Sequence, residues 1–581
     1  MKLSKLQELP TSREMIDVFG GYNHNLRIGE GEFYDMKNLT SADYPVLSPR
    51  HRRGIYAVPG KPQGMVAKDS LCYVDGSDFV INEYRVDMGL SQDDTPKNLI
   101  SMGAYVIIMP DKKYINTTNL SDYGSVEASV TTTSTVSFEL CKLDGSSYEG
   151  VKVSATEPED PANMELWIDT SSVPHTLKQY STTSMMWVDI TTTYIKITAT
   201  GLGFPFSEGD GVTITGIENA ALQDLNSNMI IWARGDNFIV VTGLLDQVTT
   251  QDTPITVARK MPNMDFIIES ENRLWGCRYG IALNGEMVNE IYASKLGDFK
   301  NWNVFNTPSI STDSYVASLG TDGQFTGAIT HLGYPLFFKE NCIHKVYGNY
   351  PANYQIQTTT CRGVQKGCSK SLAIVNEVLY YKSRSAVCAY DGSLPQEMST
   401  ALGDISYSNA VAGSLGNKYY LSMADAEGAY HLFVYDTKRG MWHREDDTQV
   451  TDFCNCRGDL YFIDHADNQI KTVQGTGVAE TANIDWMAET GVIGTDSPDK
   501  KYISRLDVRM SLKVGTRVYF YIEYDSTGKW EHLFTMTGMT LQSFTVPIRP
   551  KRCDHMRIRI EGDGEAKIYS ICKTIEQGSE L

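Results

Sequence analysis

Short apolar strands rich in tyrosine recur along the second half of the chain, and this recurrence constrains the fold more than any other feature. The strand centres Leu336, Leu379, Tyr419 and Leu460 follow one another at intervals of roughly 40 residues. A period of this length is typical of the four-stranded blade of a β-propeller, in which an apolar strand and two hairpins repeat around an axis. An ordinary β-sandwich with frequent turns is the alternative.

The spacing is not uniform everywhere. The interval from Leu274 to Leu336 is longer than the others, which predicts either an extra loop in this part of the chain or a shifted register. Strands near residues 55–118 would complete the ring with the blades that follow residue 262. These early blades are the least regular part of the repeat.

The length and composition fit an all-β protein of several domains. A chain of 581 residues is too long for one hydrophobic core, so two or more domains are expected. The 33 tyrosines and 48 glycines, with no long runs of Ala, Leu, Glu and Lys, favour strands over helices. We therefore predict an all-β fold, a β-propeller with an inserted small β-barrel or sandwich domain and a C-terminal β-sandwich.

Changes of pattern along the chain predict the domain boundaries. Ser and Thr become frequent from about residue 120, which indicates an inserted β domain. Near the C-terminus Met556, Ile558 and Ile560 alternate with arginines, as in a strand that buries one face of a jelly-roll-like sandwich. The predicted parts are an extended N-terminal arm (1–53), first propeller blades (54–119), an inserted Ser/Thr-rich β domain (120–260), remaining blades (261–480) and a C-terminal β-sandwich (481–581).

The charge balance argues against tight binding of nucleic acid. The formal net charge is −19, whereas proteins that grip phosphate backbones present clustered basic surfaces. The one compact basic run is Arg50-His51-Arg52-Arg53. Two interpretations stay open for it: a solvated turn after Pro49, or a contact with an acidic neighbouring subunit.

Motifs for catalysis or metal binding are missing from the sequence. It contains no G-x-S-x-G, H-E-x-x-H or phosphate-binding loop. The eleven cysteines lack zinc-knuckle spacing and are expected to be buried thiols. His331 and His344 lie in strand-like segments and are expected in the core, and Asp210, Asp464 and Asp467 are more often turn residues than calcium ligands. We therefore predict no catalytic residue, no cofactor and no metal, and a chain that is not an enzyme.

Several segments resemble virion proteins of tailed bacteriophages. Residues 29–39 (GEGEFYDMKNL) and 44–50 (YPVLSPR) resemble the start of phage and prophage structural proteins. Residues 271–275 (ENRLW) and 289–302 (NEIYASKLGDFKNW) are similar to the tail nozzle, or tail tubular B-like, proteins of short-tailed phages, and residues 363–368 (GVQKGC) fit the nozzle's later blades. The resemblance covers the arm and the propeller, and the insertion and C-terminal domain only loosely.

The resemblance implies a structural tail protein that forms a homo-oligomeric ring, commonly of six copies, below the portal and adaptor. Such a ring continues the DNA ejection channel and closes its end, and tail fibre or tail-tip proteins and the host envelope are further contacts. Phage DNA would pass an acidic lumen without sequence-specific binding. The first residues, MKLSKLQE, lack the features of a signal peptide, so we expect synthesis in the host bacterial cytoplasm and a final place in the virion tail.

Arm residues are the predicted subunit contacts of such a ring, because a heterologous interface is readily built from a propeller edge and an extended arm. These residues are Phe33, Tyr34, Tyr44, Arg50, Arg52 and Arg53.

Two other functions remain open. The first is a phage baseplate or adhesin module whose β-sandwich binds a cell-surface glycan. The second is a propeller glycosidase, which needs a pair of carboxylates. Asp298 and Glu340 are the residues whose mutation would affect turnover under that hypothesis.

Overall fold

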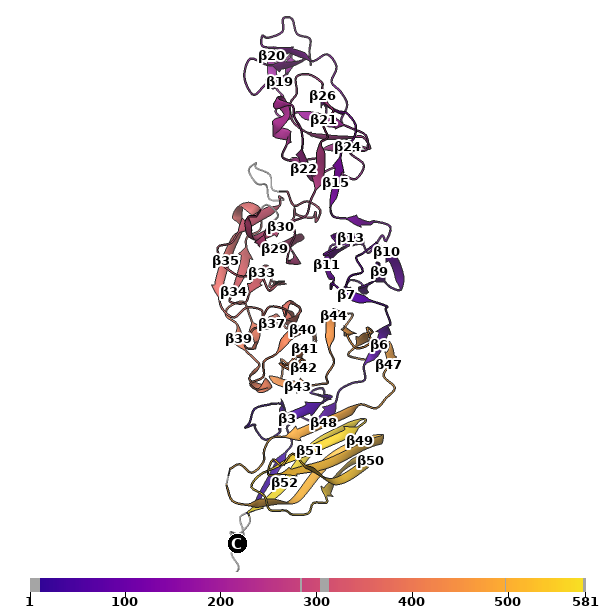
Figure 1. Ribbon diagram of the computed structural model, residues 1–581, viewed down its shortest axis with the longest axis vertical. Helices are drawn as coiled ribbons and strands as arrows, with labels where there is room; N and C mark the ends of the chain where they lie inside the picture. The colour runs from indigo at the N-terminus through magenta and orange to yellow at the C-terminus, as the bar shows by residue number, and fades with distance from the viewer. Residues whose placement is uncertain (1–10, 283–284, 304–312, 497, 578–581) are drawn as a thin grey trace, which may run out of the picture.

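The computed structural model describes residues 11–282, 285–303, 313–496 and 498–577, and these residues form an elongated all-β molecule. A ring of small sheets occupies the middle, the insertion extends from one end and a large C-terminal sheet lies at the other (Figure 1). The helices of the described part are 3-10 turns, η1 to η4: Ala220–Leu225, Pro351–Asn353, Ser369–Ser371 and Thr400–Leu402. None of them has the length and apolarity that a membrane span requires.

The ring in the middle is a β-propeller of seven described blades. Blade 1 is β7 (Pro62–Ala67), β8 (Leu71–Asp75), β9 (Asp78–Ile81) and β10 (Tyr84–Asp87); blade 2 is β11 (Asn98–Met102), β12 (Tyr105–Met109), β13 (Lys113–Asn116) and β14 (Tyr123–Ser125); blade 3 is β28 (Phe266–Ser270), β29 (Arg273–Ile281), β30 (Met287–Ala293) and β31 (Tyr315–Ser318). Blade 4 is β32 (Gly327–His331), β33 (Tyr334–Lys339), β34 (Cys342–Tyr347) and β35 (Gln355–Thr360); blade 5 is β36 (Ala373–Val375), β37 (Val378–Lys382), β38 (Val387–Tyr390) and β39 (Gln396–Glu397). Blade 6 is β40 (Ser408–Leu415), β41 (Lys418–Ala424), β42 (Tyr430–Asp436) and β43 (Met441–Arg444); blade 7 is β44 (Val450–Cys456), β45 (Asp459–Asp464), β46 (Ile470–Thr472) and β6 (Gly54–Ala57).

The first strands of the blades form the inner wall of the ring. β7 lies beside β11, β11 beside β28, β28 beside β32, β36 beside β40, β40 beside β44, and β44 beside β7. Blade 4 reaches blade 5 through η3, which precedes β36. The prediction of an all-β propeller is therefore confirmed.

The sequence repeat corresponds to the second strand of successive blades. Leu336, Leu379, Tyr419 and Leu460 lie in β33, β37, β41 and β45, and all four side chains are fully buried. Burial on both faces explains why these strands are so apolar. Within the longer interval before Leu336, β30 ends at Ala293 and β31 begins only at Tyr315.

The ring is closed by a strand from the N-terminal side of the propeller. β6 pairs with β46 of the last blade, and the short β47 (Val478–Ala479) pairs with the other edge of β6. Gly54 is required at this junction, because a Cβ there would overlap the carbonyl oxygen of Thr476. Closure by a strand distant in sequence joins the two ends of the propeller.

The insertion between β14 and β28 has its own apolar core, with Phe138, Val212 and Ile239 buried in it. One sheet contains β15 (Ala128–Thr131), β27 (Thr256–Arg259), β22 (Gly211–Thr215) and β23 (Asn228–Ile230); a second contains β24 (Ala233–Gly235), β25 (Phe238–Thr242), β21 (Tyr194–Thr198), β16 (Val136–Cys141) and β26 (Thr249–Gln251). The outer small sheet contains β17 (Lys152–Ser154), β18 (Leu166–Asp169), β19 (Thr176–Ser181) and β20 (Met186–Asp189).

The arm joins the propeller to the C-terminal sheet. β2 (Gly21–Tyr22) pairs with β43 of blade 6 and with β3 (Glu32–Lys37), and β3 pairs with β48 (Asp485–Thr490). The sheet continues through β51 (Met556–Asp563), β49 (Lys501–Tyr524), β52 (Ala566–Gln577) and β1 (Thr11–Ile16), with β50 (Trp530–Val546) on β49. The remaining arm strands, β4 (Leu39–Thr40) and β5 (Ser48–Pro49), pair with each other.

Candidate functional site

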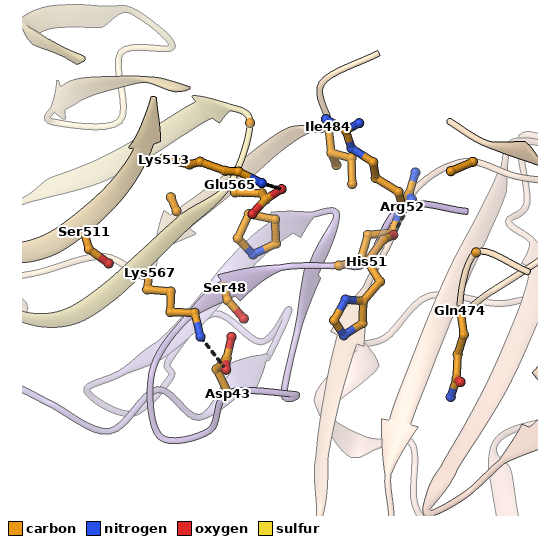
Figure 2. A pocket seen from close by; sticks show the side chains of 16 residues that line it. Asp43, Ser48, His51, Arg52, Gln474, Ile484, Ser511, Lys513, Glu565 and Lys567 are labelled. Carbon is orange, nitrogen blue, oxygen red and sulfur yellow. Dashed lines mark hydrogen bonds and ion pairs between the residues drawn. The ribbon is translucent and has the colours of Figure 1, made fainter. Parts of the chain in front are cut away.

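Two cavities lie where the arm runs between the propeller and the C-terminal sheet, and together we call them the arm cleft. The first, of about 680 Å³, is bounded by residues 43–52 of the arm and by Lys513, Glu565 and Lys567 of the C-terminal sheet (Figure 2). The second, of about 580 Å³, faces blade 6. Both are lined by Arg50, His51 and Gln474, so the basic run predicted from the sequence separates them.

Two arginines of this run are neutralised inside the chain. Arg53 is buried, and its guanidinium lies 2.8 Å from Glu445 and 2.8 Å from Asp446. Burial opposes the charge of Arg53, but Asp446 and Glu445 outweigh it and raise the pKa of this guanidinium. Arg50 lies 3.1 Å from Glu480 and donates from Nε to Asn38. These two side chains fix the arm to the propeller.

Two other groups of the run, Arg52 and His51, face the cleft without an ion pair to any described residue. Arg52 is exposed and donates from Nη1 only to the backbone oxygen of Glu480. The imidazole of His51 is exposed, and no hydrogen bond from it occurs in the described part of the chain. Figure 2 shows His51 between the Asp43–Lys567 pair and Gln474. The cleft therefore keeps a guanidinium charge that no described residue neutralises, with an imidazole beside it.

The lysines on the opposite wall are paired at the surface. Lys567 lies 2.8 Å from Asp43, and Lys513 lies 2.7 Å from Glu565. The hydrogen bond from Lys567 lowers the pKa of the Asp43 carboxyl. Exposed pairs of this kind are weak and are easily exchanged for a partner's charge.

The other predicted contact residues are used within the chain. Phe33 is 2% exposed and stacks on Phe19. Tyr34 lies under the guanidinium of Arg557, 4.7 Å from it, and Tyr44 lies 4.4 Å from the guanidinium of Arg439. The arm thus brings the three predicted arginines to one cleft and places the three predicted aromatic residues elsewhere. The role of all six at a subunit interface stays a prediction.

A third cavity, of about 460 Å³, opens on the face of the propeller between blades 4 and 5, and we call it the loop-face pocket. Its walls come from the connection that enters blade 4, the β33–β34 turn, the connection that enters blade 5 and the β37–β38 turn. Because neighbouring strands in a blade are antiparallel, these connections emerge on the same face. In chain order the polar lining residues are Asp322, Gln324, Thr326, Lys339, Glu340, Asn341, Lys366 and Arg384.

The floor of the loop-face pocket is a buried lysine. Lys339 is 1% exposed and donates from Nζ to Asn289 Oδ1 at 3.0 Å and to the backbone oxygen of Thr321 at 2.7 Å. Burial lowers the pKa of this ammonium. Beside it Thr326 is 4% exposed, and its buried hydroxyl makes no hydrogen bond.

The first strands of the described blades, which line the axis of the propeller, offer no free pair of carboxylates. In the first strands of the described blades the acidic residues are Glu269 and Asp452. Glu269 accepts a hydrogen bond from the backbone N–H of Asn272, and Asp452 accepts one from Met65 and lies 3.3 Å from Lys370. Both carboxylates are therefore occupied by local contacts.

The histidines and Asp298, considered from the sequence, also have local surroundings. His331 and His344 are buried, as expected, and burial lowers the pKa of His344 to about 4. Asp298 accepts the backbone N–H of Lys300, and burial raises its pKa. Asp298 does not line the loop-face pocket, whereas Glu340 does. The structure therefore does not bring these two carboxylates together in that pocket.

The acidic turn residues are paired with cations. Asp210 pairs with Arg259, and Asp464 and Asp467 both pair with Lys471. The described residues contain no cluster of three His, Cys, Asp or Glu side chains that could hold a metal ion.

The sequence does not single out the loop-face pocket, except for Glu340. A signal is nevertheless present, because Glu340-Asn341 and Arg384 occupy the same turn of successive repeats. Alignment of the repeats by their second strands would have placed these residues on one face of the ring.

Comparison with known proteins finds similarity only at the level of structure. No family model matches the chain, and no curated protein matches it in sequence. An exo-β-1,3-galactanase from Phanerochaete chrysosporium is similar at 9% identity and a TM-score of 0.23, over 53% of this chain and 94% of that one. A GH43 glycoside hydrolase engineered for endo-xylanase and exo-arabinofuranosidase activity shares 8% identity at a TM-score of 0.20, over 54% and 97%. The Trypanosoma rangeli sialidase shares 8% identity at a TM-score of 0.19, over 98% and 96%.

These similarities correct one prediction. The expectation that the chain is not an enzyme is contradicted, since several of the similar structures are glycoside hydrolases and one is a sialidase. A Bacillus thuringiensis Cry1Da tryptic core variant is also among the similar structures. At such low identity the likeness concerns the fold, and it transfers no substrate and no catalytic residue to this chain.

Proposed function

We propose that this chain is a tail component of a tailed bacteriophage, of the nozzle type, and that it assembles into a ring through the arm cleft. The observation that carries the proposal is the unpaired guanidinium of Arg52, beside the imidazole of His51, in a cleft between two domains of a chain whose net charge is −19. An acidic surface of a neighbouring copy complements such a cleft. The two partners would use different surfaces, as a ring requires.

The position of the cleft also supports this proposal. The arm is hydrogen-bonded to blade 6 and to the C-terminal sheet, so its basic run is held rigidly between them. A preorganised surface loses little entropy when a partner binds. The portal, the adaptor and the tail tip remain the partners that the resemblance implies, and the virion tail remains the proposed location.

Mass photometry of the purified chain, with negative-stain microscopy, tests the assembly. We expect closed rings for the natural sequence and mostly single chains for Arg52→Glu, because the reversed charge would repel an acidic partner. Arg234→Glu, an exposed change in the insertion, is the matched control and should leave the rings intact. A natural chain that stays monomeric at all concentrations would overturn the proposal.

A second candidate function is glycoside hydrolysis at the loop-face pocket. The observation that favours it is that Asp322 and Glu340 both line this pocket, since such enzymes use two carboxylates. Release of reducing sugar from a panel of polysaccharides tests it, with Glu340→Gln and Asp322→Asn as the inactive variants. Equal release by both variants and by the natural chain would exclude this site. The adhesin hypothesis stays a prediction.

A further inference from the structure

The loop-face pocket is lined by cations that form no ion pair with any described carboxylate, including Asp322 and Glu340, which line the same pocket. Lys366 and Arg384 are exposed at its rim, and neither side chain forms a hydrogen bond or an ion pair in the described part of the chain. Glu340 is engaged by the backbone N–H of Lys366 rather than by its ammonium group. Two cations from adjacent connections therefore face one opening with their charges free.

The floor of the pocket adds a hydrogen-bonding group that is incomplete without a ligand. The hydroxyl of Thr326 is buried with no partner, which is costly in a folded protein unless something else satisfies it. This hydroxyl is a second observation, independent of charge, that indicates a bound polar molecule. Lys339 lies beneath it, and its ammonium group already donates to Asn289 and Thr321. It therefore contributes a positive electrostatic potential to the pocket rather than a direct hydrogen bond to the ligand.

The size and lining of the pocket define the class of that molecule. A volume of about 460 Å³ falls within the range of small-molecule sites. Gln324, Asn341 and Thr326 supply amide and hydroxyl groups, and the described residues that line the pocket include no aromatic side chain. A compact molecule with several hydroxyls and one negative charge fits such a lining.

We infer that the loop-face pocket binds a sugar acid, that is, a monosaccharide unit bearing a carboxylate, with its carboxylate toward Lys366 and Arg384. The hydroxyls of the sugar then bond to Thr326 and to the amides of the rim. Arginine suits this role because its planar guanidinium pairs with a carboxylate through two parallel hydrogen bonds. The inference rests on the second proposed function for its site, but it requires binding and not hydrolysis.

Calorimetric titration of the full chain with glucuronate, glucose and inorganic phosphate tests the inference. We expect glucuronate to bind, and glucose and phosphate to bind at least about tenfold more weakly. Glucose lacks the negative charge, and phosphate lacks the hydroxyl groups of a sugar ring. Arg384→Ala should weaken glucuronate binding by about tenfold or more, since it removes a charge-assisted hydrogen bond. Arg362→Ala is the matched control, because this exposed arginine near the pocket pairs with Glu397 and does not line it.

Thr326→Val separates binding from folding. The variant removes a hydroxyl that has no partner in the free protein, so the melting temperature should not fall, while the affinity for glucuronate should. Absence of glucuronate binding, equal binding of glucose or phosphate, or unchanged affinity in both Arg384→Ala and Thr326→Val would each overturn the inference. Glucuronate binding without release of sugar from any polysaccharide would instead reject the hydrolase proposal alone.

Discussion

The arm cleft and the loop-face pocket both gather positive charge in an acidic chain, yet they use it differently. In the arm cleft Arg50 and Arg53 are paired with carboxylates of the same chain, and Arg52 faces the cavity without an ion pair. In the loop-face pocket Lys366 and Arg384 lack such partners among the described residues. Paired cations join the parts of the fold, whereas unpaired cations are available to a partner or a ligand.

The largest expected effect is on the paired cations of the arm. Arg53→Met leaves the buried Glu445 without its cation and leaves Asp446 with Arg50 alone, 3.9 Å away, so the free energy of unfolding should fall by about 3–5 kcal/mol. Arg384→Met, the same change at the loop-face pocket, should stay within about 0.5 kcal/mol of the natural chain. Denaturant unfolding compares the two variants. Equal losses of unfolding free energy would contradict the distinction between paired and unpaired cations.

The closure of the ring beside the arm gives the next largest effect. Gly54→Ala places a Cβ against the carbonyl oxygen of Thr476 and should cost about 1–3 kcal/mol by forcing β6 away from β46. The matched control is Gly60→Ala, in the connection between β6 and β7, where an added Cβ would lie 3.6 Å from Asp75 Oδ1, an ordinary contact.

This control should unfold within about 0.5 kcal/mol of the natural chain. Thermal or denaturant unfolding checks both variants. A Gly54→Ala chain as stable as the Gly60→Ala chain would contradict the role assigned to the junction between β6 and β46.

Acid should loosen the attachment of the arm. Burial opposes ionisation of Asp446 and Glu480, yet the arm arginines hold the pKa of each carboxyl below its usual value. Because the folded pKa is the lower one, these pairs stabilise the fold fully above the unfolded pKa, about 4, and this contribution is lost as the pH falls through the folded value. Between pH 7 and pH 3 the melting temperature should fall less steeply for Arg53→Met than for the natural chain. An equal fall in both chains would contradict the stabilising role assigned to these ion pairs.

The smallest effect on stability is expected at the loop-face pocket. Lys366→Ala keeps the backbone N–H that donates to Glu340, so the free energy of unfolding should change by no more than about 0.5 kcal/mol. The affinity for glucuronate should fall, because one of the two free cations is removed. A loss of stability above about 1 kcal/mol would show that this lysine supports the fold.

The sequence predicts the propeller well because its signal is local and repeated. Leu336, Leu379 and Leu460 each occupy the same buried strand of a blade, so the period alone identifies the unit. The path of the arm is different. Leu47 bridges to Ile568, and such a distant pairing leaves no periodic pattern in either segment.

The two sites are also predictable to different degrees, because a local pattern is visible in the sequence and a contact between distant segments is not. The run Arg50-His51-Arg52-Arg53 is contiguous, so composition singles it out, but nothing in the sequence shows that Glu445 and Asp446 neutralise part of it. Lys366 and Arg384 come from separate connections and meet only because of the way the blade folds. A site made by separate connections of a repeat becomes visible in the sequence only after the repeats are aligned.

A density map of the assembled chain at side-chain resolution tests the central claim most directly, because it shows what occupies the arm cleft. The proposal predicts a closed ring in which an acidic segment of the neighbouring copy contacts Arg52 and His51. A ring in which both cavities of the arm cleft stay open to solvent, with the copies joined elsewhere, would contradict it.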